Sequence, residues 1–451
     1  MDGQMDANGG GAGKPHVVIV GGGFGGLEAA RTLRDAPVRI TLIDKMNHHL
    51  FQPLLYQVAT AGLSPADIAA PIRNILRKQQ DVDVIMAEVT GVDKAAKLVL
   101  MGDRSIKYDY LILATGARDG YFGHDDWAQY APGLKTIPQA TDIRRRILLA
   151  FEHADTTEDE AERKALLTFV LVGGGPTGVE MAGAIGELAH KALAADFRHI
   201  DPRMARIVLI EASPRILSGF DEDLSHKSRA ALQRLGIEVR EGQRVECIDA
   251  EGVVVAGERI ASKTVIWAAG VRGSAAGEWL GVEVDRAGRV KVLDDCRIPN
   301  YPEVFVIGDT MTMEQDGKPL PGVAQVAIQQ GKYAANAIIR KLNHESGPGP
   351  FKYHDKGSLA TVGRAFAIMQ SGKVKLSGFI AWLAWLVIHI MFLIGFRNRA
   401  VVLIQWAWAY LTYQRGARLI TTPVPTDEPA PAPPQPKAAA EERKPAKSWR
   451  N

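Results

Sequence analysis

Two glycine-rich loops are the parts of this sequence whose residue types and spacing point most directly to chemistry. In a G-x-G-x-x-G loop the first glycine makes a tight turn, the second lets backbone amides approach a pyrophosphate, and the third lets a helix pack closely on a strand. Each loop follows an apolar strand and precedes a helix, whose N-terminus can face the phosphates. The sequence therefore predicts two dinucleotide sites, with glycines at Gly21, Gly23 and Gly26 and at Gly173, Gly175 and Gly178.

An acidic residue ends the strand that follows each of these helices. The first unit ends on Asp44 and the second on Glu211, and such a carboxylate can accept hydrogen bonds from an adenosine ribose. Glu211 follows Gly178 by 33 residues, and a long helix and loop account for the excess over the usual interval of about 20. The economical interpretation of two such sites is one flavin dinucleotide and one nicotinamide dinucleotide, because hydride transfer needs a donor and an acceptor ring face to face. In the second unit an acid favours a free 2′-hydroxyl, hence NADH over NADPH, and Arg215 is the residue that can weaken this preference.

Three further apolar strands end on small or acidic residues. Tyr110–Leu113 runs into Ala-Thr-Gly, Val265–Trp267 into Ala-Ala-Gly, and Val304–Ile307 into Gly308-Asp309. Small residues let the chain leave a sheet close to a cofactor, and a carboxylate after a strand suits ribityl hydroxyls, although Gly-Asp is also common in simple turns. The residues predicted to contact cofactors are Gly21, Gly23, Phe24, Gly25, Gly26, Asp44, Lys45, Thr115, Gly116, Gly173, Gly175, Pro176, Thr177, Gly178, Glu211, Gly270, Gly308 and Asp309.

Glu180 has two interpretations. Thr177-x-x-Glu180 has the spacing of a capping box, in which both side chains satisfy backbone N–H groups at a helix start. Alternatively, Glu180 points to the zone where a nicotinamide meets a flavin. Spacing alone favours the capping box.

Gln325 and Gln329 also have two interpretations. They lie four residues apart, on one face of the helix expected over residues 322–342. Two aligned amides beside small alanines can bind a planar carbonyl such as a quinone head group. The commoner fate of glutamine is a polar helix face in water, and the pattern alone favours that alternative.

Composition excludes several classes of function. The chain has 451 residues, a formal net charge of +3 and two cysteines, Cys247 and Cys296. The charge is too small to indicate nucleic acid as a partner. The cysteines form no C-x-x-C pair and no zinc spacing, so we expect neither disulfide redox chemistry nor a metal site. Residues 1–14 resemble neither a secretory signal nor a transit peptide, and we expect a loose arm.

The C-terminal part holds an apolar stretch. Between Lys375 and Arg397 lie 21 residues without Asp, Glu, Lys or Arg, and a second apolar stretch covers 400–413. A membrane span, two helices lying in one leaflet and a buried helix are the alternatives; length alone favours the span. We expect His389 to be an interfacial or packed residue rather than a ligand. The proline-rich residues 421–451 are expected to be a disordered tail.

Together, both loops, residues 47–76, the segment GGGPTGVEMAGA at 173–184, Gly308-Asp309 and the AQVAIQQ segment at 324–330 resemble the type II NADH dehydrogenases. These are single-chain, rotenone-insensitive NADH:quinone oxidoreductases. The resemblance implies an α/β fold with two Rossmann-like domains of the pyridine nucleotide-disulfide reductase kind, non-covalent FAD and a C-terminal membrane-anchoring region. By likeness, Gly21 to Gly26, Asp44, Thr115 and Asp309 hold FAD, and Gly173 to Gly178 with Glu211 hold NADH.

The resemblance also implies roles for the ambiguous residues. It moves Glu180 to the nicotinamide site, and Gln325 and Gln329 to a quinone pocket for ubiquinone or menaquinone. It further implies a homodimer attached monotopically to the cytoplasmic face of a bacterial inner membrane through residues 376–420. We expect hydride to pass from NADH to the flavin and two electrons to pass on to the quinone, without an iron–sulfur cluster and without proton pumping.

The expected organisation has six parts. They are an N-terminal arm (1–14), the first part of an FAD-binding domain (15–120), an NADH-binding domain (121–295), the second part of the FAD-binding domain (296–342), the membrane-anchoring region (343–420) and the tail (421–451).

Three other functions are alternatives. A soluble flavin reductase donating electrons to a ferredoxin-like protein shares both loops but lacks the apolar C-terminus. A sulfide:quinone oxidoreductase needs a cysteine relay, which two cysteines do not favour. A redox-gated signalling protein is the non-catalytic alternative.

Overall fold

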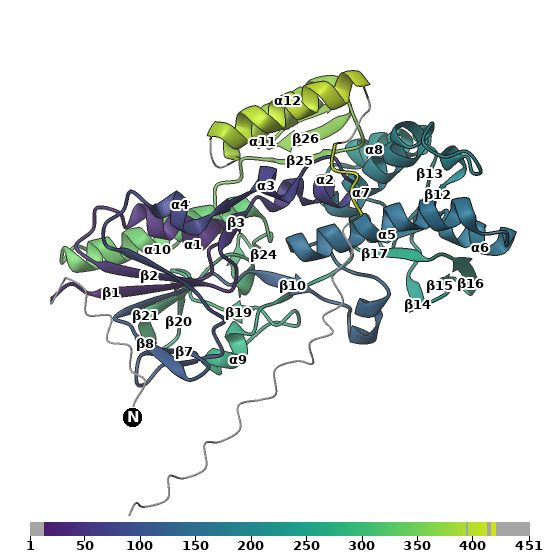
Figure 1. The fold of residues 1–451 in the computed structure, drawn as a ribbon. Coiled ribbons are helices and arrows are strands. Elements are labelled where there is room, and N and C mark those ends of the chain that lie inside the picture. Colours follow the sequence, from purple (N-terminus) through teal and green to yellow (C-terminus); the bar gives the residue numbers. More distant parts are fainter. Residues whose placement is uncertain (1–12, 394–395, 413–415, 421–451) are drawn as a thin grey trace, which may run out of the picture. The chain divides into compact units, whose positions relative to one another are not determined.

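The computed structural model describes residues 13–393, 396–412 and 416–420 (Figure 1). The expected arm and tail lie outside these residues, apart from the last two residues of the arm. The described residues form one compact unit. Within this unit, two parallel sheets each carry one glycine-rich loop, which confirms the predicted α/β class.

The first sheet has six strands in the order β20-β21-β9-β1-β2-β5. All five residues of β1, HVVIV, are buried, as expected of a parallel strand covered on both faces. β21 pairs parallel with β9 although the second sheet lies between them in sequence. The strands are β1 (His16–Val20), β2 (Arg39–Asp44), β5 (Val82–Met86), β9 (Tyr110–Leu113), β20 (Arg297–Ile298) and β21 (Tyr301–Val306).

The second sheet has four parallel strands in the order β13-β12-β11-β17. The chain passes between the two sheets twice, and the crossing segments β10 and β18 pair antiparallel. The elements are β10 (Ala117–Asp119), β11 (Thr168–Val172), β12 (Arg206–Glu211), β13 (Ile237–Glu241), β17 (Thr264–Trp267) and β18 (Val271–Gly273).

Two helices that cover the first sheet touch through glycines. A Cβ atom on Gly331 of α10 would lie 2.2 Å from the carbonyl oxygen of Gly25 in α1, so only glycine allows this approach. The principal helices are α1 (Phe24–Thr32), α2 (Leu55–Ala59), α5 (Ile137–Thr156), α7 (Pro176–Glu187), α8 (Glu222–Arg234) and α10 (Ala324–Leu342).

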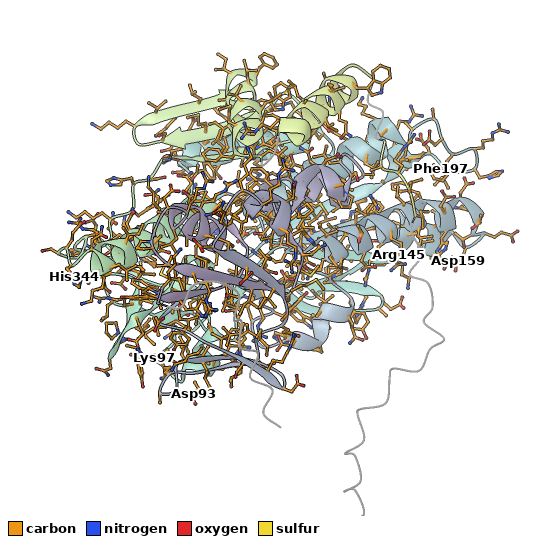
Figure 2. All side chains as sticks on the ribbon, turned by 60° about the vertical axis from the view of Figure 1, so that its left-hand side comes forward. Asp93, Lys97, Arg145, Asp159, Phe197 and His344 are labelled. Atoms are coloured by element: carbon orange, nitrogen blue, oxygen red, sulfur yellow. The ribbon has the colours of Figure 1, made fainter. Side chains whose placement is uncertain are left out.

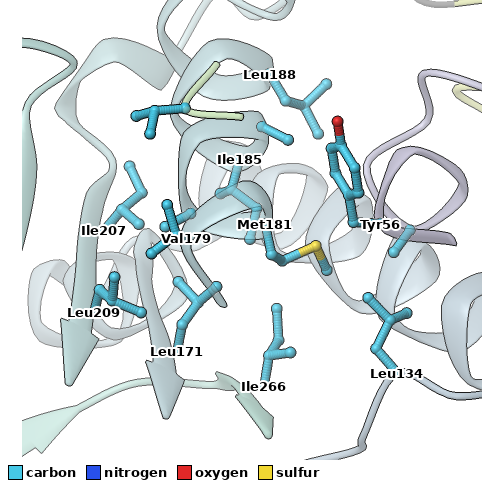
Figure 3. Close-up of a cluster of buried hydrophobic side chains, with 14 of the residues drawn as sticks. Tyr56, Leu134, Leu171, Val179, Met181, Ile185, Leu188, Ile207, Leu209 and Ile266 are labelled. Carbon is cyan, nitrogen blue, oxygen red and sulfur yellow. The ribbon is translucent and has the colours of Figure 1, made fainter. Parts of the chain in front are cut away.

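The second sheet shares its core with a helix from the first part of the chain. Tyr56 of α2 lies beside Met181 of α7 in Figure 3, in the same buried cluster as Leu171 of β11. This packing fixes α2 against α7. In Figure 2 the labelled side chains of Asp93 and Lys97 lie at one side of the molecule, and those of Arg145 and Asp159 lie at the other.

Smaller elements complete the fold. Antiparallel sheets are formed by β6-β7-β8 and by β14-β15-β16. Their bounds, with those of the remaining short elements, are β3 (His48–Leu50), β4 (Ala69–Pro71), β6 (Gly91–Asp93), β7 (Leu98–Met101), β8 (Arg104–Lys107), β14 (Val245–Asp249), β15 (Gly252–Val255), β16 (Glu258–Ala261), β19 (Val290–Lys291), β22 (Met311–Thr312), β23 (Glu314–Gln315), β24 (Lys318–Pro319), α3 (Pro65–Ile68), α4 (Ile72–Leu76), α6 (Glu160–Leu166) and α9 (Ala276–Leu280).

The C-terminal apolar stretch is divided between a strand and two helices. β25 (Ser358–Thr361), β26 (Ala367–Ser371) and β27 (Val374–Gly378) form an antiparallel sheet, followed by α11 (Phe379–Phe392) and α12 (Phe396–Thr412). The first residues of the apolar stretch therefore belong to β27. In the part of the chain that the structure describes, no helix is both long and apolar enough to cross a bilayer.

These two helices lie next to each other beside α3 and β26 (Figure 1). The indole N–H of Trp406 in α12 donates to Oε1 of Gln57 at 2.7 Å, which ties α12 to α2. Large apolar side chains on both helices remain exposed: Phe379, Ile380, Leu383, Val387, Met391, Phe392, Leu403, Ile404 and Trp408.

Candidate active site

The first glycine-rich loop is held by the acid at the end of β2. The backbone N–H of Gly22 donates to Oδ2 of Asp44 at 2.6 Å, and the N–H of Met46 donates to Oδ1 at 2.7 Å. A Cβ on Gly26 would lie 1.9 Å from the carbonyl oxygen of Gly21, whereas a Cβ on Gly23 would meet no atom within 4 Å. The third glycine therefore permits close packing, and the second faces open space where a phosphate can approach.

The second loop repeats this arrangement. Gly174 donates to Oε2 of Glu211 at 2.5 Å, and Ser213 donates to Oε1 at 2.6 Å. A Cβ on Gly178 would lie 1.8 Å from the carbonyl oxygen of Gly173, and Gly175 faces open space. Both loops thus have the shape that a dinucleotide requires.

Arg215 is engaged within its own turn. Its guanidinium donates to the carbonyl oxygens of Phe220 at 2.8 Å and Ser218 at 3.2 Å. In this position it is not directed at the carboxylate of Glu211.

A cleft of about 690 Å³ is lined by residues near both loops. The first sheet and the segments that follow its strands contribute one wall, the N-terminus of α7 another, and α10 with α11 close it. Of the predicted site residues, the lining contains Gly23, Phe24, Gly25, Gly116, Pro176, Thr177, Glu180, Gly270, Gly308, Asp309 and Gln325. The predicted residues outside the lining are Gly21, Gly26, Asp44, Lys45, Thr115, Gly173, Gly175, Gly178, Glu211 and Gln329.

Thr115 connects segments instead of lining the cleft. Its hydroxyl lies 2.6 Å from that of Ser274 and 3.2 Å from that of Thr310. It therefore joins the ends of β9 and β18 to the Gly308–Thr310 turn. Lys45, the other predicted contact near the first loop, is exposed.

The capping-box interpretation of Glu180 is wrong. α7 begins at Pro176, because proline is well suited to the first helical position. Its N-cap is therefore Gly175 and not Thr177, and no side chain caps the helix. Glu180 lies at the cleft wall, where its Oε1 accepts from the N–H of Thr361 at 3.4 Å. Burial raises the pKa of Glu180 to about 8, so the carboxyl can hold a proton at neutral pH.

Both glutamines of α10 bind the backbone of the segment that follows this helix. Gln325 donates to the carbonyl of Gly357 at 2.9 Å and accepts from the N–H of Lys356 at 3.2 Å. Gln329 donates to the carbonyl of His354 at 2.9 Å and accepts from its N–H at 3.0 Å. The interpretation of a polar face turned only to water is therefore wrong, since each amide fixes part of the cleft wall.

Asp309 lies deep in the cleft. Burial raises the pKa of its carboxyl group, and the positive charges of Lys135 and Arg289 oppose this effect. Lys135 lies in the lining itself, where it is the only lysine or arginine among the described residues. The irregular stretch around Lys135 carries no period or motif, so the sequence offered no signal for it.

His389 also lines the cleft, where it packs against aromatic rings, with its ring centroid 4.3 Å from that of Trp385. This agrees with the expectation of a packed residue. Its position as the one histidine in a long apolar stretch is the sequence feature that sets it apart from its neighbours.

The two cysteines lie outside the cleft lining. Cys296 is buried and Cys247 lies on β14, and neither is part of the lining. Burial strongly raises the pKa of Cys296, which keeps it a thiol. Among the residues that the structure describes, no three His, Cys, Asp or Glu side chains are grouped to hold a metal ion.

Comparison with known proteins identifies the family. Residues 15–331 match the family described as pyridine nucleotide-disulphide oxidoreductase. The type II NADH:quinone oxidoreductase Ndh of Mycobacterium tuberculosis is 47% identical over 420 residues, covering 90% of each chain. A type II NADH:quinone oxidoreductase of Staphylococcus aureus is 31% identical over 77% of this chain and 87% of its own.

A solved structure supports the same fold. NDH2 of Plasmodium falciparum in complex with NADH superposes with a TM-score of 0.82 at 22% identity, over 91% of this chain and all (100%) of that one. The fold, the two glycine-rich loops and the relatives agree. The chain therefore belongs to the pyridine nucleotide-disulphide oxidoreductases and, within them, to the type II NADH:quinone oxidoreductases.

Proposed function

We propose that this chain carries out both half-reactions of an NADH:quinone oxidoreductase in the 690 Å³ cleft. The observation that carries the proposal is that one cleft is lined from both nucleotide-binding loops and from α10. Hydride transfer requires donor and acceptor rings in contact, and a cleft shared by two dinucleotide sites provides that arrangement.

The first loop fits a flavin adenine dinucleotide. Gly23 faces open space beside the N-terminus of α1, which favours a pyrophosphate. Gly116 and Asp309 line the cleft beyond it and suit the ribityl chain and the ring. When bound, non-covalent FAD supplies the two-electron chemistry that connects NADH to quinone.

The second loop fits NADH. Gly175 faces open space at the start of α7, and Pro176, Thr177 and Gly270 lead from the loop into the cleft. Glu211 holds the loop and offers a carboxylate to an unphosphorylated ribose, so the proposed donor is NADH and not NADPH.

Glu180 is the proposed group at the nicotinamide. Its position at the cleft wall and its raised pKa allow it to hold a proton there and to donate a hydrogen bond. Gln325 and Gln329 shape the quinone end of the cleft, because they anchor the segment that contributes Tyr353 and Asp355 to the lining.

The exposed apolar surface of α11 and α12 is the proposed membrane contact. Ile380 is 69% exposed and Ile404 is 68% exposed, values that are unfavourable in water and favourable in the boundary of a lipid leaflet. Monotopic attachment to the cytoplasmic face of a bacterial inner membrane, a homodimer and the absence of proton pumping complete the proposal, on the strength of the family resemblance.

Anaerobic stopped-flow spectroscopy tests the proposal. Adding NADH to the flavin-loaded protein should bleach the absorbance near 450 nm, and adding ubiquinone or menaquinone analogues should restore it. Protein that carries no flavin, or that stays yellow after NADH addition, contradicts the proposed function.

A further inference from the structure

His389 of the C-terminal helix α11 is part of the cleft lining. We propose that Nε2 of His389 accepts a hydrogen bond from a hydroxyl group of the hydroquinone product, so that this residue recognises the reduced form of the acceptor. The inference rests on the proposed placement of the quinone in the cleft.

A backbone hydrogen bond fixes which nitrogen of His389 carries the proton. Nδ1 lies 2.7 Å from the carbonyl oxygen of Trp385, one turn earlier in α11. A carbonyl oxygen can only accept, so Nδ1 must be the donor. In the neutral ring Nε2 then has no hydrogen and presents a lone pair.

The surroundings of His389 keep the ring neutral and oriented. It stacks on Trp385 with centroids 4.3 Å apart and an angle of 28°, and it meets the edge of Phe51 at 6.1 Å. Burial lowers the pKa of His389 to about 4. An acceptor nitrogen is therefore the state present at neutral pH.

The neighbouring lining suits a flat, apolar ring. Phe51, Ile388 and Phe392 line the cleft together with His389. A quinone head group has carbonyl oxygens that only accept hydrogen bonds, so it gains nothing from Nε2. A hydroquinone has hydroxyl groups that donate, so the same nitrogen favours the product.

The opposite face of α11 is exposed. Val387 and Met391 are 51% and 61% exposed and belong to the proposed membrane contact. α11 thus has exposed apolar side chains on one side and His389, which lines the cleft, on the other. A hydroquinone bound at His389 would therefore lie against α11, the helix that belongs to the proposed membrane contact.

No proton is transferred to His389 in this inference. The overall reaction, NADH + H⁺ + quinone giving NAD⁺ + hydroquinone, is balanced without it. The ring acts as a hydrogen-bond acceptor in the product complex.

The matched variants His389→Asn and His389→Gln test the inference. Asparagine can still donate to the Trp385 carbonyl but has no acceptor at the position of Nε2, whereas the longer glutamine reaches that position with its amide. We expect His389→Asn to raise the inhibition constant of a short-chain hydroquinone by about three- to tenfold, the value of one hydrogen bond. The KM for the quinone should change by less than about twofold on the same reasoning, since quinone makes no bond to this atom.

Three further measurements complete the experiment. His389→Gln should restore most of the hydroquinone inhibition, and flavin bleaching by NADH should keep its wild-type rate in both variants. His226→Phe is the control for histidine loss away from the cleft, because His226 is an exposed residue of helix α8. If His389→Asn retains no flavin, His389→Phe, which keeps a stacked ring, replaces it.

Unchanged hydroquinone inhibition in His389→Asn, or inhibition equally weak in His389→Gln, overturns the inference. Gln325→Ala separates this failure from failure of the proposed quinone site. If Gln325→Ala raises the quinone KM while His389→Asn has no effect, the proposed quinone site is supported and the proposed role of His389 is contradicted. If neither variant changes the quinone KM or the hydroquinone inhibition constant, the proposed quinone site is contradicted as well.

Discussion

At the scale of single residues, Glu180 combines burial with an ionisable group at the cleft wall. A carboxyl group at this depth is disfavoured in its charged form, and the bond from Thr361 compensates only in part. Glutamine has nearly the same shape and stays neutral at all pH values. Comparing the two residues therefore isolates the effect of the charge.

We expect Glu180→Gln to change the pH dependence of stability. The pKa of Glu180 is raised from 4.5 to about 8, so the wild-type chain has its full stability contribution below pH 4.5 and loses it as the pH rises through 8. The Tm of Glu180→Gln minus that of the wild type should therefore increase between pH 5 and pH 9. A pH-independent difference, measured by calorimetry on flavin-loaded protein, contradicts a raised pKa.

Residue patterns predicted the loops because each loop and its acid belong to one strand-loop-helix-strand unit. Asp44 and Glu211 each end the second strand of such a unit, and each accepts a hydrogen bond from the loop backbone. Glu180 was harder, because the helix start depends on Pro176, one residue before the apparent cap Thr177. Its partner Thr361 comes from a distant strand that no short motif reveals.

At the scale of elements, α10 connects the two ends of the cleft. Its N-terminal half carries Gln325 and Gln329, which anchor residues 354–357, and its middle packs on α1. The sequence placed both amides on one helix face. It could not supply their partners, because residues 343–357 have no helix or strand period that fixes their course.

Replacing Gln329 should affect the acceptor more than the donor. Gln329→Ala removes both hydrogen bonds to His354 and frees the segment that forms one cleft wall. With about 1 kcal/mol lost for each of the two bonds, we expect the quinone KM to rise by up to about thirtyfold while the NADH KM changes little. Steady-state kinetics with each substrate varied in turn provides the measurement, and equal changes in both KM values argue against the proposed role.

The C-terminal stretch shows where length alone misleads. Twenty-one uncharged residues suggested a span, yet the first of them pair in β27 and the helix ends at Phe392. β26 and β27 form a hairpin, with Ser371 paired to Val374, and composition alone does not encode this pairing. The apolar character instead appears as an exposed surface on two shorter helices.

At the scale of the whole molecule, the exposed surface of α11 and α12 should govern attachment to lipid. The double substitution of Ile380 and Ile404 by Asp introduces two charges into this surface, and each lost isoleucine removes about 2 kcal/mol of apolar burial. Binding to vesicles of phosphatidylglycerol and phosphatidylcholine should fall at least about tenfold in a flotation assay.

The matched control is Met204→Asp, because Met204 is 74% exposed but lies far along the chain from these helices. It should bind vesicles as the wild type does. Reduction of a water-soluble acceptor by NADH should persist in all three proteins. Vesicle binding that survives the double substitution contradicts the proposed contact.

The contact between Gly25 and Gly331 constrains any attempt to re-engineer the enzyme. Gly25 belongs to the proposed flavin end and Gly331 to the helix that shapes the proposed acceptor end, and a Cβ on Gly331 would lie 2.2 Å from the carbonyl oxygen of Gly25. Libraries intended to broaden the range of acceptors should therefore leave this pair unchanged. A substitution there would be expected to loosen coenzyme retention and acceptor choice together, however conservative it looks in an alignment.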